Sequence, residues 1–343
     1  MKCRARALTG APARTLRKQR GVAMVIAMLV FALSTALVVA MSSEFTLVMR
    51  KGSNVFIGQQ AAAYLRGGED LAGLVLRQDR EQDREADSLR DHLEEAWAQQ
   101  VPPYALDEGG WLAGRLVDLQ GRFNLNDLDG RAPEGKRFTP AQEQFIRLLQ
   151  TPEEPRISEQ DAILITESIL DWMDRDGDPR DYGAEDDYYF DQTPSYRSAN
   201  REFASVSELR VVAYMTPELY AAVAPSLTVW GSGGKVNIHT ADIPLLRSIN
   251  SAGDLQPLSL AEGEALFELR EEQGFSDVQA LVDSQVLAGR EIDASVLARL
   301  GESSSWFLYL GEVEVADRVA RLYSVLHRDG TRVEAVVRSN API

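Results

Sequence analysis

The sequence has few of the residues that many enzymes use as nucleophiles or as metal ligands. Of its 343 residues, one is cysteine and three are histidine. Cys3 is the single thiol, so the chain can form no internal disulfide, and the region after it has no thiolate for catalysis. No metal-ligand spacing joins any two of His92, His239 and His327. A nucleophile elbow, a P-loop and a dinucleotide fingerprint are also missing from the sequence, so we do not expect an enzyme.

Acidic residues are missing from the first twenty positions, whereas the rest of the chain is strongly acidic. The chain has 36 Lys and Arg against 52 Asp and Glu, a formal net charge of -16. Seven of the basic residues lie within positions 2–20, so 29 basic and 52 acidic residues remain, a net charge of -23. A surface of this sign repels phosphate backbones. We therefore expect no nucleic acid partner.

A long uncharged run follows the basic start. Val22 to Met41 comprises 20 residues without a charge. At about 1.5 Å per residue these span about 30 Å, the thickness of the hydrocarbon core of a bilayer. The run exceeds the apolar core of a cleaved secretory signal, which predicts a retained anchor. Because the basic flank favours a cytoplasmic N-terminus, we expect a single-pass protein whose body lies outside the membrane, which in a bacterium is the periplasm.

Beyond the membrane, strand patterns flank a long helical region. Helical spacing continues to about Arg66, Gly67-Gly68 permits a kink, and a charged helix is predicted from Leu71 to Gln100. Alternating residues predict strands before about residue 127 and after about residue 303. Flanking strands can pair across a helical insertion. The sequence therefore predicts an α+β fold with a long N-terminal helix, a small antiparallel sheet and a large helical insertion.

The predicted domains follow from these patterns. They are a leader (1–21), a transmembrane helix (22–41), an amphipathic helix with the first strands (42–127), a helical insertion (128–302) and closing strands (303–343). The insertion divides into two units, 128–232 and 233–302. Capping residues mark the starts of their helices, near Thr139, Ser158, Ser205 and Thr216 in the first unit and Thr240, Ser259, Ser276 and Asp293 in the second.

The stretch GGKVNIHTADIPLL (233–246) resembles the opening of a helix-hairpin-helix module, a small SAM-like helical unit that can hold DNA backbones. Asn237 in this stretch and Asn124 occupy similar positions, since each follows a hydrophobic residue just before helical sequence. We interpret both as strand-to-helix corners whose side chains bond local backbone. A DNA-uptake protein stays a possible alternative, but the acidic neighbours argue against it.

The most carboxylate-rich stretch is DWMDRDGDPRDYGAEDDYYFD (171–191), with nine acidic residues against two arginines. Asp174, Asp176, Asp178 and Glu185 stand at positions 1, 3, 5 and 12 of a loop, as in calcium-binding loops. Pro179 at position 6 departs from the EF-hand pattern. Hard oxygen ligands without His or Cys suit calcium. The predicted ligands are Asp171, Asp174, Asp176, Asp178, Glu185 and Asp186, with one or two ions; Asp187, Asp191 and Glu208 are candidates for a second site.

The junction between Gly21 and Val22 carries a resemblance. A basic run that ends in glycine, followed directly by an apolar stretch, resembles the class III signal of type IV pilins and pseudopilins. The resemblance implies cleavage between Gly21 and Val22 by a prepilin peptidase and methylation of the new N-terminus. Most members carry glutamate at the fifth position after the cut, where this chain has Ile26. A subunit with nothing above it would not need that carboxylate, and burying it unpaired is costly.

With Ile26 and the acidic loop together, the sequence is similar to the minor pseudopilin K family of the type II secretion system. Asp171-Trp172, the Gly-Ala-Glu-Asp of 183–186, and the segments 196–200 and 205–209 carry this similarity. The resemblance implies a subunit at the tip of the pseudopilus that binds I- and J-type pseudopilins and primes assembly for the export of folded proteins. Whether an H-type pseudopilin also binds is left open. A minor pilin of a type IV pilus is the alternative; such pilins usually lack the insertion.

Overall fold

The computed structural model describes residues 20–107 and 109–343, so almost all of the predicted leader lies outside the described residues. The chain divides into two compact units, one that ends at Gln59 and one from Gln60 to Ile343. One helix, α1 (Arg20–Glu85), belongs to both. All other described helices and strands belong to the second unit.

The first unit is a bare apolar helix. Every large apolar side chain of α1 between Val22 and Phe56 is exposed. The helix is long and apolar enough to cross a membrane, and none of its most apolar window is buried by the rest of the protein. Exposed apolar surface of this length is covered by lipid or by other apolar helices, because water solvates it poorly.

The helix predicted from Leu71 to Gln100 is wrong in its second half. α1 ends at Glu85, and residues 86–100 form turns. Asp87 has a left-handed backbone (φ 53°), which a helix cannot contain. Beyond it, the Asp91 N–H donates to the carbonyl of Glu302 (2.9 Å) rather than to a preceding turn. Contacts with the sheet domain therefore override the helical pattern here.

The second unit is built on a five-stranded antiparallel sheet in the order β1-β2-β7-β8-β9. Its strands are β1 (Tyr104–Ala105), β2 (Trp111–Asp118), β7 (Trp306–Val315), β8 (Arg318–Asp329) and β9 (Arg332–Ser339). The predicted pairing across the insertion is confirmed, because Asp118 at the end of β2 lies opposite Phe307 at the start of β7. The chain thus leaves the sheet and returns to it at the same end.

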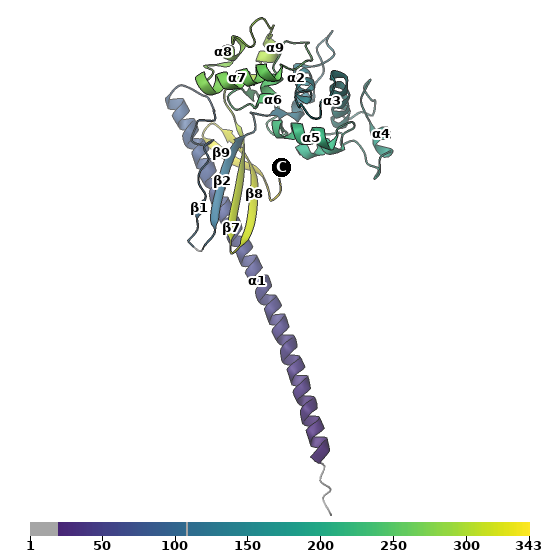
Figure 1. Ribbon diagram of the computed structural model, residues 1–343, viewed down its shortest axis with the longest axis vertical. Coiled ribbons are helices and arrows are strands. Elements are labelled where there is room, and N and C mark those ends of the chain that lie inside the picture. Colours follow the sequence, from purple (N-terminus) through teal and green to yellow (C-terminus); the bar gives the residue numbers. More distant parts are fainter. Residues whose placement is uncertain (1–19, 108) are drawn as a thin grey trace, which may run out of the picture. The chain divides into compact units, whose positions relative to one another are not determined.

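The C-terminal part of α1 packs on this sheet (Figure 1). Glycines allow the close approach: the Tyr309 hydroxyl occupies the space of a Cβ at Gly68, and Val333 lies 3.7 Å from that of Gly73. Glu69 of α1 pairs with Arg338 of β9 (2.7 Å). Gly67 and Gly68 both lie inside the continuous helix.

The first helical unit begins and ends in a small parallel pair of strands. β3 (Phe123–Asn124) pairs with β4 (Leu227–Thr228). Between them lie η1 (Leu125–Leu128), α2 (Pro140–Leu149), α3 (Glu159–Met173), α4 (Asp186–Phe190), η2 (Val206–Val211), α5 (Pro217–Val223) and η3 (Ala224–Ser226). The predicted caps at Thr139, Ser158, Ser205 and Thr216 are confirmed, since each side chain accepts a backbone N–H of the following turn.

The second helical unit repeats this plan. β5 (Val236–Asn237) pairs in parallel with β6 (Leu300–Gly301). Between them lie α6 (Ile243–Arg247), α7 (Leu260–Gln273), α8 (Val278–Val282) and α9 (Ala294–Leu297). Ser259 and Asp293 are caps as predicted, whereas Asp242 and Asp277 cap where Thr240 and Ser276 were expected. The similar positions of Asn124 and Asn237 in the sequence thus correspond to the opening strands of two similar units.

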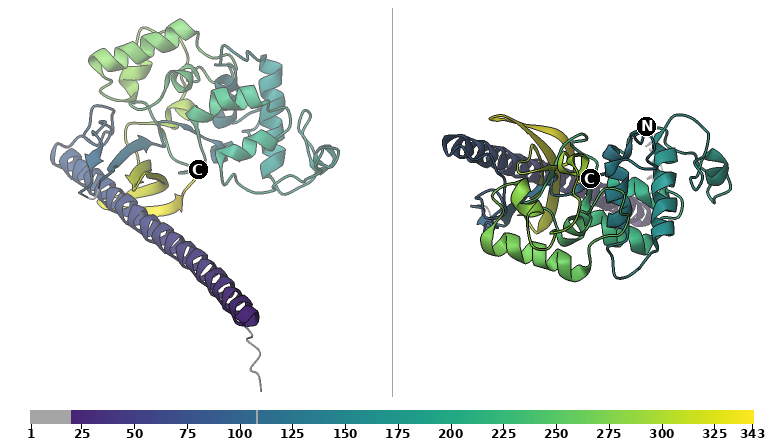
Figure 2. Two further views of the ribbon diagram at one scale, coloured as in Figure 1. Left: turned by 60° about the horizontal axis from the view of Figure 1, so that its bottom comes forward. Right: turned by 90° about the horizontal axis from the view of Figure 1, so that it is seen from above.

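One hydrophobic core runs through both helical units, which lie side by side beyond one end of the sheet (Figures 1 and 2). Phe145 of α2 and Leu246 of α6 are fully buried in it. Arg147, 1% exposed, donates from α2 to the carbonyls of Ser251 (3.0 Å) and Asp254 (2.6 Å). The helical units therefore form one packed body.

Candidate functional site

The acidic loop joins α3 to α4, and α3 fixes where it starts. The helix buries Ile165 and Ile169 in the core, and the same registry places Asp171 in its last turn with no exposed surface. Asp174 is the C-cap residue, with extended backbone (φ -72°, ψ 173°) that ends the helix. The loop then returns to Glu185, the residue before α4.

Three of the six predicted ligands come together. Asp174, Asp176 and Glu185 each offer a carboxylate oxygen, and these oxygens all lie within 4.8 Å of one another. Glu185 is 6% exposed and Asp176 lies at the surface. The three-carboxylate group is therefore exposed to solvent at Asp176 and shielded from it at Glu185.

Two oxygens of this group are buried without a hydrogen-bond partner among the described residues. They are Oδ1 of Asp174 and Oε1 of Glu185. Burial, and then the nearby carboxylates of Asp171 and Asp174, raise the pKa of Glu185 to about 7. Carboxylates at this spacing repel each other. A cation bound between them would attract all three and outweigh that repulsion. The donor set consists only of oxygens and fits a hard ion such as calcium.

Asp171 lies behind this group and organises the loop. Its carboxylate pairs with the Arg180 side chain and accepts the Arg180 backbone N–H (3.1 Å). Arg180 also pairs with Oδ2 of Asp174 (2.6 Å), so its charge already offsets part of the repulsion. The Asp171 carboxylate fills the space that a Cβ at Gly183 would need. Glycine at 183 therefore allows the loop to close onto Asp171.

The structure places the other two predicted ligands outside the three-carboxylate group. Asp178 is exposed, and its backbone N–H donates to Oδ1 of Asp176 (3.1 Å). Asp186 accepts both the backbone N–H and the hydroxyl of Ser198, each at 3.0 Å. Asp186 thus joins α4 to the loop segment around Ser198.

The residues considered for a second ion do not form a group with each other among the described residues. Asp187 and Asp191 are exposed. Glu208 caps η2 by accepting the N–H of Ala204 (2.8 Å) and pairs with Arg201 (3.1 Å). The carboxylate of Glu208 is therefore engaged in local structure.

Aromatic rings back the acidic loop. Trp172 meets Tyr189 edge-on, with ring centroids 5.2 Å apart, and Tyr189 lies 5.3 Å from Tyr196. The Tyr189 hydroxyl accepts the N–H of Ala213 (3.3 Å). Because aromatic packing of this kind stabilises a defined arrangement, the loop is held against the first helical unit at its α4 end.

The structure adds a second polar centre, which was not found from the sequence. The Asn237 side chain, fully buried, donates to the carbonyl of Asp91 (2.9 Å), to Asp118 (3.1 Å) and to Ser304 (2.9 Å). Its oxygen accepts the N–H of His239 (3.0 Å), which is the local backbone bond expected of a corner residue. The motif 233–246 thus fastens the second helical unit to the sheet.

A buried ion-pair cluster lies next to this joint. Arg328 is 1% exposed and pairs with Asp79 (2.9 Å) and Asp91. Carboxylate oxygens of Asp79, Asp91 and Glu95 lie within 4.8 Å of one another. Burial raises the pKa of Glu95 to about 8 and that of Asp83 to about 6. Since Arg328 already supplies positive charge, the cluster is explained as an ion pair. In the sequence, the one sign of this cluster was an arginine at an inward-facing position of the strand that became β8.

Comparison with known proteins identifies the class and then the family. An apolar helix that continues onto an antiparallel sheet defines a pilin-like subunit, here with a helical insertion. The model of the first domain of type II secretion system protein K matches residues 121–232. That range covers the first helical unit, including the acidic loop.

Relatives that match over most of their length indicate the same family. The chain is 32% identical over 314 residues to type II secretion system protein K of Pseudomonas aeruginosa, covering 91% of this chain and 90% of the relative. It is also 32% identical over 319 residues to the protein K of Aeromonas hydrophila, covering 91% and 94%. The chain therefore belongs to the type II secretion system protein K family.

A solved structure shares the fold. It is the crystal structure of the GspK-GspI-GspJ complex from the type 2 secretion system of enterotoxigenic Escherichia coli. The match has a TM-score of 0.69 and 24% sequence identity, and it covers 83% of this chain and 97% of the other. The α+β fold predicted from the sequence is confirmed.

Proposed function

We propose that this chain is the minor pseudopilin at the tip of a type II secretion pseudopilus, where it assembles with I- and J-type pseudopilins and primes the fibre. The solved complex that shares its fold contains K, I and J subunits, which supports this assignment. The mechanism is structural: α1 and the sheet join the subunit to its neighbours. No chemical step is required of the chain, which agrees with the lack of catalytic motifs in its sequence.

The observation that carries this proposal is the exposed apolar surface of α1. Its large apolar side chains from Val22 to Phe56 are all exposed. Before assembly we propose that they lie in the inner membrane, with the basic residues before them in the cytoplasm and the body in the periplasm. After assembly the same surface packs against the apolar helices of neighbouring subunits, as family resemblance implies.

Processing follows from the same segment. We propose that prepilin peptidase cuts between Gly21 and Val22 and that the new N-terminus is methylated. Both residues lie in α1, and a Cβ at Gly21 would meet no other atom within 4 Å. The side chain of Ile26 is 57% exposed and apolar. An apolar residue at this position suits a subunit that has no other subunit above it.

Co-purification tests the proposal. We expect the full chain, extracted in detergent with I- and J-type subunits, to be recovered as a complex with both. The variant Ile26→Glu should lower recovery, because an unpaired charge at apolar depth costs about 3 kcal/mol. Ile26→Leu is the matched control and should leave recovery unchanged. Recovery of the chain without either subunit, or equal recovery of Ile26→Glu and Ile26→Leu, contradicts the tip assignment.

We further propose that calcium binds Asp174, Asp176 and Glu185, and that Asp171 positions them. The buried, unpartnered oxygens of Asp174 and Glu185 support this. Bound calcium would offset much of the negative charge of the three carboxylates and hold α4 against the end of α3. A ligand that binds only the folded state raises its stability. We therefore expect chelator to lower the melting temperature; an unchanged value, with no ion found by mass spectrometry, would contradict calcium binding.

Three arginines of the second helical unit that could have faced DNA are engaged by the protein itself. Arg270 donates to the carbonyl of Ala241 (2.6 Å), and Arg290 pairs with Glu262 (2.5 Å). Arg299 pairs with Asp127 (3.4 Å). Because phosphate binding needs unengaged positive charge facing the ligand, we expect no gel shift with duplex DNA at moderate salt. Family membership also decides against the type IV pilus alternative.

A further inference from the structure

Arg180 lies between the three-carboxylate group of the acidic loop and the buried carboxylate behind it. Its Nη1 donates to Oδ2 of Asp174 (2.6 Å) and also pairs with Asp171. Asp174 therefore belongs to two arrangements. It is half of an ion pair, and it also offers an oxygen within 4.8 Å of those of Asp176 and Glu185. A calcium ion and the guanidinium of Arg180 would meet at this one carboxylate.

The two oxygens of Asp174 have different surroundings. Oδ2 accepts from Arg180, whereas Oδ1 is buried and has no hydrogen-bond partner among the described residues. Because both oxygens belong to one carboxylate, a divalent ion bound at Oδ1 would lie close to the guanidinium at Oδ2. Like charges at such a short distance repel each other. Binding of the ion therefore favours departure of the guanidinium from Asp174.

The backbone of Arg180 is held in place independently of its side chain. The Arg180 N–H donates to Oδ2 of Asp171 (3.1 Å), and the Arg180 carbonyl accepts the N–H of Gly183 (3.1 Å). Asp171 has no exposed surface, and its carboxylate fills the space beside Gly183. Backbone bonds thus fix the turn that brings Glu185 back toward Asp174. The guanidinium can move without changing the course of the loop.

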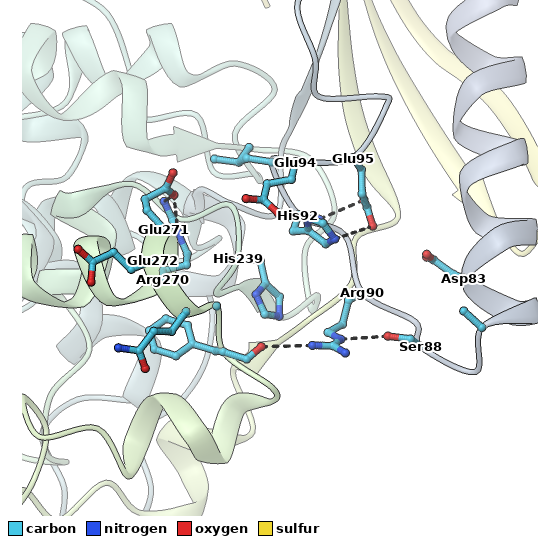
Figure 3. A pocket seen from close by; sticks show the side chains of 15 residues that line it. Asp83, Ser88, Arg90, His92, Glu94, Glu95, His239, Arg270, Glu271 and Glu272 are labelled. Atoms are coloured by element: carbon cyan, nitrogen blue, oxygen red, sulfur yellow. Dashed lines mark hydrogen bonds and ion pairs between the residues drawn. The ribbon is translucent and has the colours of Figure 1, made fainter.

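A second group of three carboxylates contains a guanidinium that cannot leave. The group consists of Asp79, Asp91 and Glu95. Its Glu95 lies in the wall of the cleft shown in Figure 3. Arg328 pairs with the other two, has no exposed side-chain surface and also donates to the carbonyl of Ser304 (2.8 Å). The Arg180 side chain, in contrast, is 37% exposed, so it can turn from Asp174 into solvent.

We propose that Arg180 is an internal cation that competes with calcium for Asp174 and thereby sets the calcium concentration at which the loop binds the ion. Without calcium, the guanidinium offsets the charges of Asp171 and Asp174. When calcium binds, the guanidinium leaves Asp174. This inference rests on the calcium site proposed above and adds the residue that tunes it.

Arg180 has two opposing effects on calcium affinity, which depends on the charge and the rigidity of the ligand set. Its positive charge lowers the affinity, because it reduces the net negative charge and occupies a ligand. Its contacts also order the loop, which raises the affinity. The effect of charge is the larger one, because the backbone bonds to Asp171 and Gly183 remain when the side chain is replaced.

Titration of the full chain in detergent with calcium chloride, followed by calorimetry, tests this role. Arg180→Gln should bind calcium about tenfold more tightly than the unsubstituted chain, a gain of about 1.4 kcal/mol, because Asp174 is then free for the ion. Arg180→Lys keeps the charge and should stay close to the original affinity. Arg175→Gln is the matched control. It removes the same charge from the same loop, but from an exposed side chain, and should leave the affinity nearly unchanged.

Thermal unfolding adds a readout that a purely structural residue would not give. In excess chelator, Arg180→Gln should melt below the unsubstituted chain, because the buried carboxylate of Asp171 has lost its partner. Saturating calcium should raise the melting temperature of the variant by more than that of the unsubstituted chain. A residue that only supports the loop would lower both the melting temperature and the calcium affinity when replaced.

A double variant covers the case in which Arg180→Gln does not fold without calcium. Asp171→Asn with Arg180→Gln removes the buried charge and its partner together, and the asparagine oxygen can still accept the backbone N–H of residue 180. This variant should fold in chelator and should bind calcium more tightly than the unsubstituted chain. Affinity equal to or below the original would count against competition at Asp174.

The results separate this inference from the calcium proposal. Equal or weaker calcium binding by Arg180→Gln, or an equal gain in Arg175→Gln, would overturn the role of Arg180 and leave the calcium site in place. Binding by Arg180→Gln but not by the unsubstituted chain would contradict calcium binding in the natural protein and support the competition. Absence of binding in both would contradict both proposals.

Discussion

Single carboxylates in this protein differ in role according to what surrounds them. Asp171 and Asp186 are both in the acidic loop, and both are engaged by neighbouring donors, Arg180 and Ser198. Glu185 lies between them and has a buried oxygen without a partner. The sequence spacing led to the loop and to the prediction of a calcium ion there, which stays a prediction. It could not separate ligands from supporting residues, because that distinction depends on Arg180, whose role the spacing does not encode.

Glu185 provides the sharpest test of the calcium proposal. Replacing it with glutamine removes a charged ligand but keeps the volume, so we expect calcium affinity to fall at least about tenfold, or 1.4 kcal/mol. Asp187→Asn, an exposed change in the same segment, should leave affinity unchanged. Titration calorimetry measures both. Equal affinities for the two variants would place the ion elsewhere.

Asn237 is the residue on which the joint between sheet and helices depends. Asn237→Ala leaves Asp118, the Asp91 carbonyl and the His239 N–H each without one partner in a buried site. We expect a loss of about 1–3 kcal/mol in the free energy of unfolding. Asn340→Ala, an exposed asparagine, is the control. Urea unfolding monitored by tryptophan fluorescence gives both values; a loss no greater than that of the control would contradict this role.

At the scale of elements, local signals predicted the helical units well. Ser158 and Ser259 cap α3 and α7, which were both expected from sequence. The failure lies at residues 86–100, where the charged, amphipathic pattern favours a helix. There Trp97 packs against Phe307 with ring centroids 5.2 Å apart, and Arg328 takes the carboxylate of Asp91. These partners are more than 200 positions away, so no local pattern could reveal them.

The contact between α1 and the sheet predicts opposite effects for two adjacent glycines. Gly68→Ala would drive a methyl group into the Tyr309 hydroxyl, and we expect it to destabilise the body by about 1–3 kcal/mol. Gly67 has nothing within 4 Å of its Cβ position. Gly67→Ala should therefore stabilise by about 0.5–1 kcal/mol, because alanine favours helix. Thermal unfolding measures the change in stability of both variants. A change of the same sign in the two would contradict this packing.

At the scale of the whole molecule, buried acids make stability depend on pH. Burial raises the folded-state pKa of Glu95 to about 8, from its ordinary value of 4.5. Between these two values the folded state holds a proton that the unfolded chain has lost. Stability contributed by this group therefore falls as pH rises.

We expect the melting temperature of the full chain to be higher at about pH 6 than at about pH 8, and Glu95→Gln to reduce that difference, since glutamine cannot lose a proton. The acidic loop also contributes, because the pKa of Glu185 is raised to about 7. Comparison of the two proteins at each pH isolates Glu95. An identical pH dependence in the variant would show that Glu95 titrates normally.

The pairing of β2 with β7 has a consequence for how the protein is made. Asp118 and Phe307 are neighbours in the sheet, and everything from residue 119 to residue 305 lies between them in the chain. Contacts of such long sequence separation form slowly, because a large loop must close first. As the chain emerges from the ribosome, the helical body can collapse around its own core before β7 to β9 exist. The sheet surface against which the C-terminal part of α1 packs is then completed last, after β9 has been made.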